Sequence, residues 1–345
     1  MSELASESMN TGRPRAGAPS LRGAVDRALL EVSDLAVAFG GVRTVRGVSL
    51  TVAPGQTLAV VGESGSGKSL TSLAVMGLLP AQASVVEGEV RFDGRDLFDL
   101  SPDELRALRG EELAMIFQDP LSALNPSLTV GYQIAEMFRR RRGMSRSAAR
   151  DRAVAAMTEV GIPDAAQRAK DYPHEFSGGM RQRVMIAMAL ALEPRLLIAD
   201  EPTTALDVTV QAQILRLLRE RRRDGLAMII ISHDLGVVAR TAQSVVVMYA
   251  GQAVESGTIG EVYSRPAHPY TLGLMAASPS ARDGAREIRP IDGNPPDPTA
   301  LPEGCAFHPR CPFARERCRT ETPVPQVLPS GRASTCHFAE EVLSA

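Results

Sequence analysis

Apolar and polar positions alternate along this chain in a way that predicts short strands and amphipathic helices following one another. Residues 29–39 alternate between apolar and polar side chains, as strands with one exposed face do. Later runs are continuously apolar, which is the pattern of buried parallel strands. These runs are 57–61, 195–200 (ending in carboxylates), 227–231 and 245–249. Helical periodicity fills much of 121–172 and returns at 178–193 and 211–222. The alternation predicts an α/β fold with a mainly parallel, doubly wound sheet.

A glycine-rich loop joins the strand at 57–61 to a helix that begins near Leu70. The loop fits G-x-x-x-x-G-K-[ST] in full and consists of Gly62, Glu63, Ser64, Gly65, Ser66, Gly67, Lys68 and Ser69. Its glycines let backbone N–H groups surround phosphate oxygens, and the helix N-terminus adds partial positive charge. Lys68 is expected to neutralise the β- and γ-phosphates, and Ser69 to offer a hydroxyl to Mg²⁺. The chain has only two lysines, so one at this position favours nucleotide binding over an ordinary loop.

Two adjacent carboxylates end the apolar run at 195–200. A carboxylate at the tip of a buried strand can reach Mg²⁺ beside a phosphate loop, and Asp200 fits that role through the water shell of the ion. Glu201 is then placed to polarise an attacking water. The pair therefore predicts phosphoryl transfer to water rather than nucleotide binding alone.

Further segments resemble the motifs of the ATP-binding subunits of ABC transporters, in the order and spacing of that family over about residues 28–265. The segment Phe176, Ser177, Gly178, Gly179, Met180 is similar to the LSGGQ signature and departs from it at Phe176 and Met180. Gln118 resembles the glutamine of the Q-loop, and His233 resembles the switch histidine. The D-loop is matched by Ala205, Leu206 and Asp207. Phe39 occupies the place of the aromatic that stacks on adenine.

The resemblance implies a P-loop NTPase fold of the ABC ATPase type. It has a RecA-like core, an antiparallel β-subdomain and a helical subdomain at about 120–175. Two ATP molecules are then held in a head-to-tail dimer, each between the phosphate loop of one subunit and the signature of the other. The implied catalytic residues are Glu201, His233 and Gln118, and the implied Mg²⁺ ligands are Ser69, Gln118 and Asp200. The implied ATP-binding residues are Phe39, Gln118, Asp200 and the loop residues from Gly62 through Leu70.

Residues 176–190 and the segment His268-Pro269-Tyr270-Thr271 are similar to ATPases of oligopeptide and dipeptide importers. This implies a second ATPase subunit, identical or related, two permeases in the membrane and an extracytoplasmic solute-binding protein. Nickel or another small solute is the alternative cargo. A non-transport ABC ATPase with a redox- or iron-sensing tail is the alternative class.

All four cysteines lie beyond residue 300, at Cys305, Cys311, Cys318 and Cys336. Four thiolates can hold Zn²⁺ or an iron–sulfur cluster, while the wide gaps lack the C-x₂-C spacing of structural zinc. The family resemblance points to a [4Fe-4S] cluster, with Zn²⁺ as the alternative and four unligated cysteines as the third interpretation.

Composition narrows the function classes without naming one. The chain has 345 residues, 44% of them hydrophobic, and a net charge of −2, which does not favour a nucleic-acid partner. No apolar run approaches the length of a membrane span, so we expect a peripheral subunit on the cytoplasmic face of the membrane. We divide the chain into a disordered tail at 1–27, an ATP-binding domain at 28–265 and an accessory domain with the cysteines at 266–345.

Overall fold

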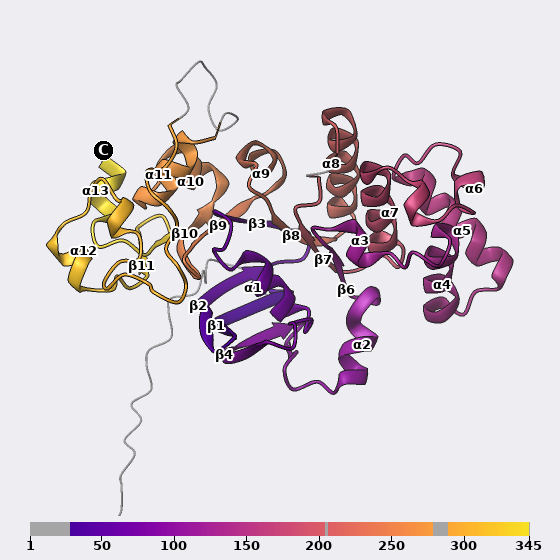
Figure 1. Cartoon of the computed structure of the whole chain (residues 1–345), viewed down its shortest axis with the longest axis horizontal. Helices are drawn as coiled ribbons and strands as arrows, with labels where there is room; N and C mark the ends of the chain where they lie inside the picture. Colours follow the sequence, from indigo (N-terminus) through magenta and orange to yellow (C-terminus); the bar gives the residue numbers. More distant parts are fainter. Residues whose placement is uncertain (1–27, 204–205, 279–288, 345) are drawn as a thin grey trace, which may run out of the picture.

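The computed structural model describes residues 28–203, 206–278 and 289–344 (Figure 1). The expected N-terminal tail therefore lies outside the described residues. The largest sheet has eight strands in the order β11-β12-β10-β9-β3-β8-β7-β6. Neighbours from β9 to β6 are parallel, and β10, β12 and β11 continue the sheet antiparallel. The strands are β3 (Thr57–Val61), β6 (Leu113–Ile116), β7 (Leu196–Asp200), β8 (Ala227–Ile231), β9 (Ser244–Tyr249), β10 (Gln252–Thr258), β11 (Gln326–Val327) and β12 (Ala333–Ser334).

A second, antiparallel sheet has the order β2-β1-β4-β5. Its strands are β1 (Leu30–Phe39), β2 (Val42–Val52), β4 (Ala83–Phe92) and β5 (Arg95–Asp96). Gly40 and Gly41 both have positive φ and form the turn between β1 and β2. The predicted antiparallel β-subdomain is confirmed, with longer strands than the sequence pattern marked, because polar residues at the exposed ends still pair across the sheet.

Helices cluster beyond the β6 edge of the large sheet, on the right in Figure 1. Ser101 caps the first of them with a capping box, in which its hydroxyl accepts from the amide of Glu104. Ser145 caps α5 through the amide of Ala148. The helices from Pro102 to Leu190 are α2 (Pro102–Glu111), α3 (Pro120–Ala123), α4 (Val130–Arg142), α5 (Arg146–Glu159), α6 (Ala165–Arg168), the 3-10 turn Pro173–Glu175 and α7 (Gly178–Leu190).

Helices α1 (Lys68–Val75) and α7 pack on opposite faces of the large sheet. Successive side chains of a strand point to opposite faces. Leu196 and Ile198 of β7 join the core cluster that contains Val75 of α1. The alternate residues of β7, including Leu197, join the cluster that contains Val184 of α7 and the apolar side of α8 (Val208–Arg223). This is the layered α/β arrangement that the sequence predicts, and it separates the phosphate loop from the signature helix.

The C-terminal segments pack around the β9–β10 end of the same sheet. They share a core with the central strands, in which Val61 of β3 and Tyr249 of β9 cluster with Tyr270 and Phe307. The helices here are α9 (Leu235–Thr241), α10 (Ile259–Ser264), α11 (Pro269–Ala276), the 3-10 turn His308–Arg310, α12 (Glu316–Thr320) and α13 (Ala339–Ser344).

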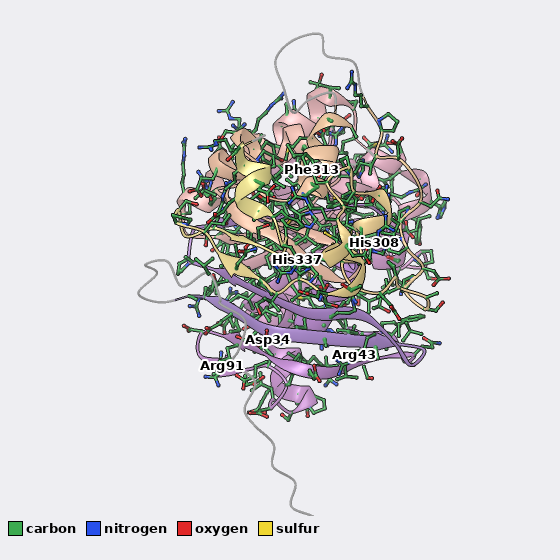
Figure 2. All side chains as sticks on the ribbon, turned by 90° about the vertical axis from the view of Figure 1, so that its left-hand side faces the viewer. Asp34, Arg43, Arg91, His308, Phe313 and His337 are labelled. Atoms are coloured by element: carbon green, nitrogen blue, oxygen red, sulfur yellow. The ribbon has the colours of Figure 1, made fainter. Side chains whose placement is uncertain are left out.

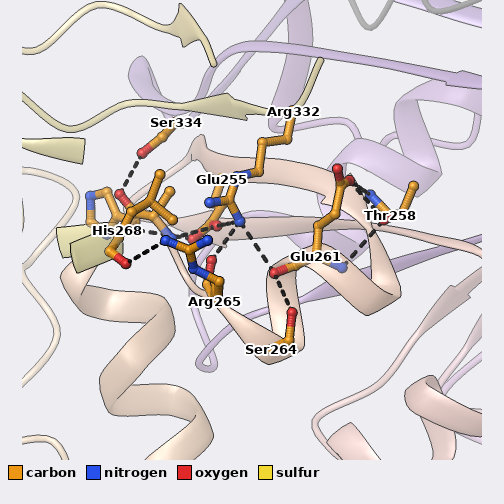
Figure 3. Close-up of polar contacts among 10 residues, drawn as sticks. Glu255, Thr258, Glu261, Ser264, Arg265, His268, Arg332 and Ser334 are labelled. Atoms are coloured by element: carbon orange, nitrogen blue, oxygen red, sulfur yellow. Dashed lines mark hydrogen bonds and ion pairs between the residues drawn. The ribbon is translucent and has the colours of Figure 1, made fainter. Parts of the chain in front are cut away.

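A buried polar network fastens the final strands to β10 (Figure 3). The Glu255 carboxylate accepts hydrogen bonds from the amides of Ala267 (2.8 Å) and His268 (3.0 Å). Nη1 of Arg332 lies 4.0 Å from the same carboxylate and donates to the carbonyl of Glu261. Ser334 donates to the carbonyl of Ala267 at 2.9 Å. The C-terminal part is thus joined to the ATP-binding part by strand pairing and by buried charge.

Candidate nucleotide-binding site

The glycine-rich loop lies between β3 and α1 and depends on glycine at its first and last glycine positions. Gly62 has φ +151, and a Cβ there would lie 2.2 Å from the carbonyl oxygen of Met248. Gly67 has φ +97 and precedes the first turn of α1. An L side chain at either position is strained by the backbone conformation. The loop therefore turns back on the helix N-terminus with its amides unobstructed, as phosphate binding requires.

Lys68 turns its ammonium group back over this loop. Nζ donates to the carbonyls of Gly62 (2.8 Å) and Glu63 (2.7 Å) and lies 3.3 Å from Oγ of Ser66. Burial lowers the pKa of Lys68, and the carboxylates of Glu201, Asp200 and Glu63 act in the opposite direction. A cation is therefore held inside the loop by acceptors that a phosphate group can replace.

Asp200 ends β7 beside the loop and is buried. Burial raises the pKa of this carboxyl group, while a hydrogen bond with Ser69 and the nearby Lys68 act to lower it. A carboxylate and a hydroxyl oxygen are the hard ligands that Mg²⁺ takes, and the ion usually keeps several waters and binds substrate phosphates. The donor set therefore fits Mg²⁺ without a protein cage.

Glu201 is the point where three of the predicted site residues come together. Its φ of +50 is in the left-handed region, and its amide donates to the carbonyl of Ile231 at 3.0 Å. Oε1 lies 3.0 Å from Nδ1 of His233, and Oε2 accepts from Nε2 of Gln118 at 3.4 Å. A non-glycine residue in this conformation costs about 1–3 kcal/mol and is typical of functional sites. The turn after β7 aims the carboxylate between the glutamine and the histidine.

Phe39 ends β1 and is 43% exposed, so the ring is open to solvent. Stacking on adenine stays a prediction for this residue. Leu70 lies in the first turn of α1 and is partly buried against the core on that face of the sheet.

The signature residues form the N-terminus of α7. Oγ of Ser177 accepts from the amide of Met180 at 3.3 Å. Ser177 and Gly178 are exposed, and Gly179 is partly buried. Phe176 is buried beneath the guanidinium of Arg168, which explains why an aromatic residue is accommodated where the family has leucine. Because α7 and α1 pack on opposite faces of the sheet, this N-terminus is separate from the phosphate loop of the same chain.

The D-loop is only partly described. Ala205 lies outside the described residues. Leu206 packs at the edge of the core cluster that contains α7, and its amide donates to the carbonyl of Thr203 at 3.1 Å. Asp207 caps α8, with Oδ1 accepting from the amide of Val210 at 3.0 Å.

Two residues that the sequence analysis did not assign to the nucleotide site contact the phosphate loop. The hydroxyl of Tyr270 accepts from the amide of Glu63 at 2.8 Å. The guanidinium of Arg310 pairs with the carboxylate of Glu63 at 2.7 Å. Tyr270 lies in the His-Pro-Tyr-Thr segment noted for its resemblance alone, and no local pattern marks Arg310.

The predicted iron–sulfur cluster is wrong, and so is zinc as its alternative. All four cysteines line one small pocket in the C-terminal part, together with His308, Phe313 and His337, which Figure 2 labels at that end of the molecule. Within residues 28–203, 206–278 and 289–344, no group of three or more His, Cys, Asp or Glu side chains is arranged to hold a metal ion. Burial raises the pKa of Cys311 to about 12 and of Cys336 to about 11.

Comparisons with known proteins agree with this geometry. The family model described as "ABC transporter" matches residues 45–204, and the model described as "Oligopeptide/dipeptide transporter, C-terminal region" matches residues 254–318. A putative peptide import ATP-binding protein of Brucella abortus is 50% identical over 89% of this chain and 94% of its own length. The dipeptide transport ATP-binding protein of Bacillus subtilis is 49% identical over 91% and 95%. The oligopeptide transport ATP-binding protein of Salmonella typhimurium is 50% identical over 91% and 95%.

Solved structures extend the similarity to three dimensions. A dimeric post-hydrolysis ATP-binding cassette bound to ADP and Pi has a TM-score of 0.61 at 28% identity, covering 67% of this chain and 98% of the cassette. The described helices include none both long and apolar enough to cross a membrane. The phosphate loop, the carboxylates after β7 and the similarity along most of the chain lead to one conclusion: the chain belongs to the ATP-binding subunits of ABC transporters and is an ATPase.

Proposed function

We propose that this chain hydrolyses ATP to drive the import of peptides through partner membrane subunits. The proposal that the cargo is a peptide rests on the match of residues 254–318 to the C-terminal region of oligopeptide/dipeptide transporters. This match lies beyond residues 45–204, which match the ABC transporter model, so it is separate from the match of the ATPase motifs. The named relatives are peptide, dipeptide and oligopeptide transport proteins, which supports the same class of solute over nickel.

Phosphoryl transfer from ATP to water requires the protein to position the reacting groups and to neutralise the charge of the phosphates. The loop from Gly62 to Ser69 receives the triphosphate, with Lys68 moving from its carbonyl partners to the β- and γ-phosphates. Ser69, Asp200 and Gln118 would hold Mg²⁺, which would neutralise charge on the phosphates. Glu201 orients and polarises the attacking water, and His233 holds the carboxylate while its ring faces the γ-phosphate.

The second half of each site comes from another subunit. Ser177 and the backbone amides after it form a helix N-terminus suited to a γ-phosphate. Since α7 and α1 lie on opposite faces of one sheet, we infer that the signature of one protomer covers the ATP of its mate, in a homodimer or with a related ATPase. Leu206 and Asp207 then lie along the interface as part of the D-loop.

The complete transporter contains two permease subunits, with this chain on the cytoplasmic face of the membrane and a solute-binding protein on the opposite side. ATP-driven closure of the dimer moves the permeases, and hydrolysis reopens it. Within this chain, we propose that residues 28–265 form the ATP-binding domain and residues 266–345 the accessory domain.

Uptake by cells that carry Glu201→Gln in place of the native chain tests the cargo. We expect uptake of a radiolabelled dipeptide to fall to background while uptake of radiolabelled nickel is unchanged. Loss of nickel uptake with normal dipeptide uptake would contradict the proposal in favour of the alternative solute. Normal uptake of both would favour a non-transport ATPase.

A further inference from the structure

The carboxylate of Glu63, the second residue of the phosphate loop, is held by the C-terminal part of the chain. Nη1 of Arg310 lies 2.7 Å from one oxygen and Nη2 lies 3.0 Å from the other. The Arg310 side chain is 4% exposed and that of Glu63 is 26% exposed, so the pair is shielded from solvent. Two parallel N–H···O bonds fix both planes, which makes this a more specific contact than a surface ion pair.

The backbone of the same residue is held from a second direction. The amide of Glu63 donates to the hydroxyl of Tyr270, which is fully buried. The ring of Tyr270 packs against those of Tyr249 (4.6 Å between centroids) and Phe307 (5.4 Å). Side chain and main chain of Glu63 are therefore both bound by groups that follow the ATP-binding core in the sequence.

Arg310 is itself rigidly placed. Its Nε donates to the carbonyl of Asp292 at 2.9 Å, and its guanidinium lies over the rings of Tyr249 and Phe307. It ends the turn His308–Arg310, directly before Cys311 and within the segment that lines the cysteine pocket. Arg310 therefore links that segment directly to the phosphate loop.

The charge of Glu63 gives this contact a consequence for ATP. An unpaired carboxylate on a loop that surrounds phosphate groups repels them, because both carry negative charge. Arg310 neutralises the carboxylate of Glu63. The positive charge of Lys68 then acts on the phosphates without an opposing negative charge on the loop. The pair is therefore more than a link between two parts of the fold.

We propose that Arg310 is a positioning residue for the nucleotide, and that through it the C-terminal part sets the affinity of the phosphate loop for ATP. This inference rests on the phosphate-binding role of residues 62–69. It predicts that Arg310→Gln raises KM for ATP about tenfold while kcat changes less than about twofold. A tenfold change in affinity lies within the roughly 5- to 150-fold range that is typical of coupling between two sites. Glu63→Gln in the Arg310→Gln background should recover most of the lost affinity, because the repelling charge is then gone.

Binding of a fluorescent ATP analogue and steady-state hydrolysis by the purified full-length chain test this. Arg315→Gln is the matched control, because it removes an arginine from an exposed bidentate pair with Glu341 in the same part of the chain. Arg310→Lys keeps the charge without the fork and should show an intermediate affinity, which keeps the test open if Arg310→Gln does not fold.

Two failures are distinguishable. If Lys68→Ala binds ATP as tightly as the native chain, the phosphate-binding role of the loop is wrong. If Lys68→Ala abolishes binding but Arg310→Gln and Arg310→Lys match the control, only the inference about Arg310 is overturned. A loss in Arg310→Gln that Glu63→Gln does not reverse would also overturn it, since that result describes a structural contact with no electrostatic role.

Discussion

Nδ1 of His233 lies 3.0 Å from Oε1 of Glu201, and this contact joins the ends of two neighbouring parallel strands. Asp200 pairs with Ile231 across β7 and β8, so the residues that follow them emerge side by side at one edge of the sheet. The histidine and the amide of Gln118 hold the two oxygens of the same carboxylate. The carboxylate is therefore oriented by its neighbours rather than by the nucleotide.

Replacing Glu201 with glutamine should separate ATP binding from hydrolysis. The variant keeps the size of the side chain and its contacts but cannot polarise water, so turnover should fall about 10²- to 10⁴-fold with ATP affinity retained. Single-turnover hydrolysis and equilibrium binding measure the two effects. Glu220→Gln, on the exposed side of α8, is the control and should leave both unchanged. Near-normal turnover in Glu201→Gln would count against the assigned role.

Gly178→Asp should change stability and activity in opposite directions. Nothing lies within 4 Å of a Cβ at this position, and an acidic residue in the first turn of α7 stabilises the helix by about 0.3–1 kcal/mol. In a two-subunit site, however, the carboxylate faces the γ-phosphate bound by the mate, so hydrolysis should fall about 10- to 100-fold. Thermal unfolding and ATPase assays, with Gly178→Ala as control, measure this. Equal activity of both variants would show that no phosphate approaches α7.

Gly62→Ala should destabilise the protein by more than its backbone conformation alone explains. The added Cβ meets the carbonyl oxygen of Met248 at 2.2 Å, so β9 or the loop must shift. Gly94→Ala is the matched control, because φ is +80 there and nothing lies within 4 Å. We expect the free energy of unfolding, measured by urea denaturation, to fall by about 1–2 kcal/mol in Gly94→Ala and by clearly more in Gly62→Ala. Equal losses would mean that the loop relaxes without cost.

Glu255 and His268 should oppose each other as the pH falls. Burial raises the pKa of Glu255 to about 7, so the folded state takes up this proton first and gains stability as the pH falls from 7 to about 4.5. Burial lowers the pKa of His268 to about 3, so the unfolded state takes up that proton first and the folded state loses stability below about 6.5. Between pH 6.5 and 4.5 the two contributions largely cancel.

Glu255→Gln removes one side of this balance. The variant should lose about 2–3 kcal/mol between pH 6.5 and 4.5 beyond the change in the native chain, because only His268 still titrates differently in the two states. Unfolding measured at both pH values, with Glu340→Gln as the control for loss of a charge, tests the expectation. The same pH slope in Glu255→Gln and the native chain would contradict it.

The sequence was most informative where function depends on local residues. The loop from Gly62 to Ser69 and the carboxylates after Ala199 could be placed on their strands from apolar runs and spacing alone, because each run is short, buried and bounded by turn residues. The contacts of Glu63 could not, since Arg310 lies 247 residues away in a segment without periodicity. Strands β11 and β12 have two residues each, too few to leave an alternating pattern.

For the cysteines, the prediction made from the sequence was wrong. Their clustering in the sequence was interpreted as ligation, whereas burial among Phe307, Phe313 and Phe338 accounts for the same residues as apolar lining of a pocket. Spacing alone does not distinguish thiolate ligands from buried thiols, because the difference lies in the surrounding solvent and charge.

A cryo-EM map of the Glu201→Gln protein loaded with ATP and Mg²⁺ would show whether each ATP is shared by two protomers. We expect a dimer in which Ser177 and the N-terminus of α7 in one protomer lie against the γ-phosphate held by Lys68 of its partner. A map in which each ATP is enclosed by one protomer, with Ser177 facing solvent, would contradict it.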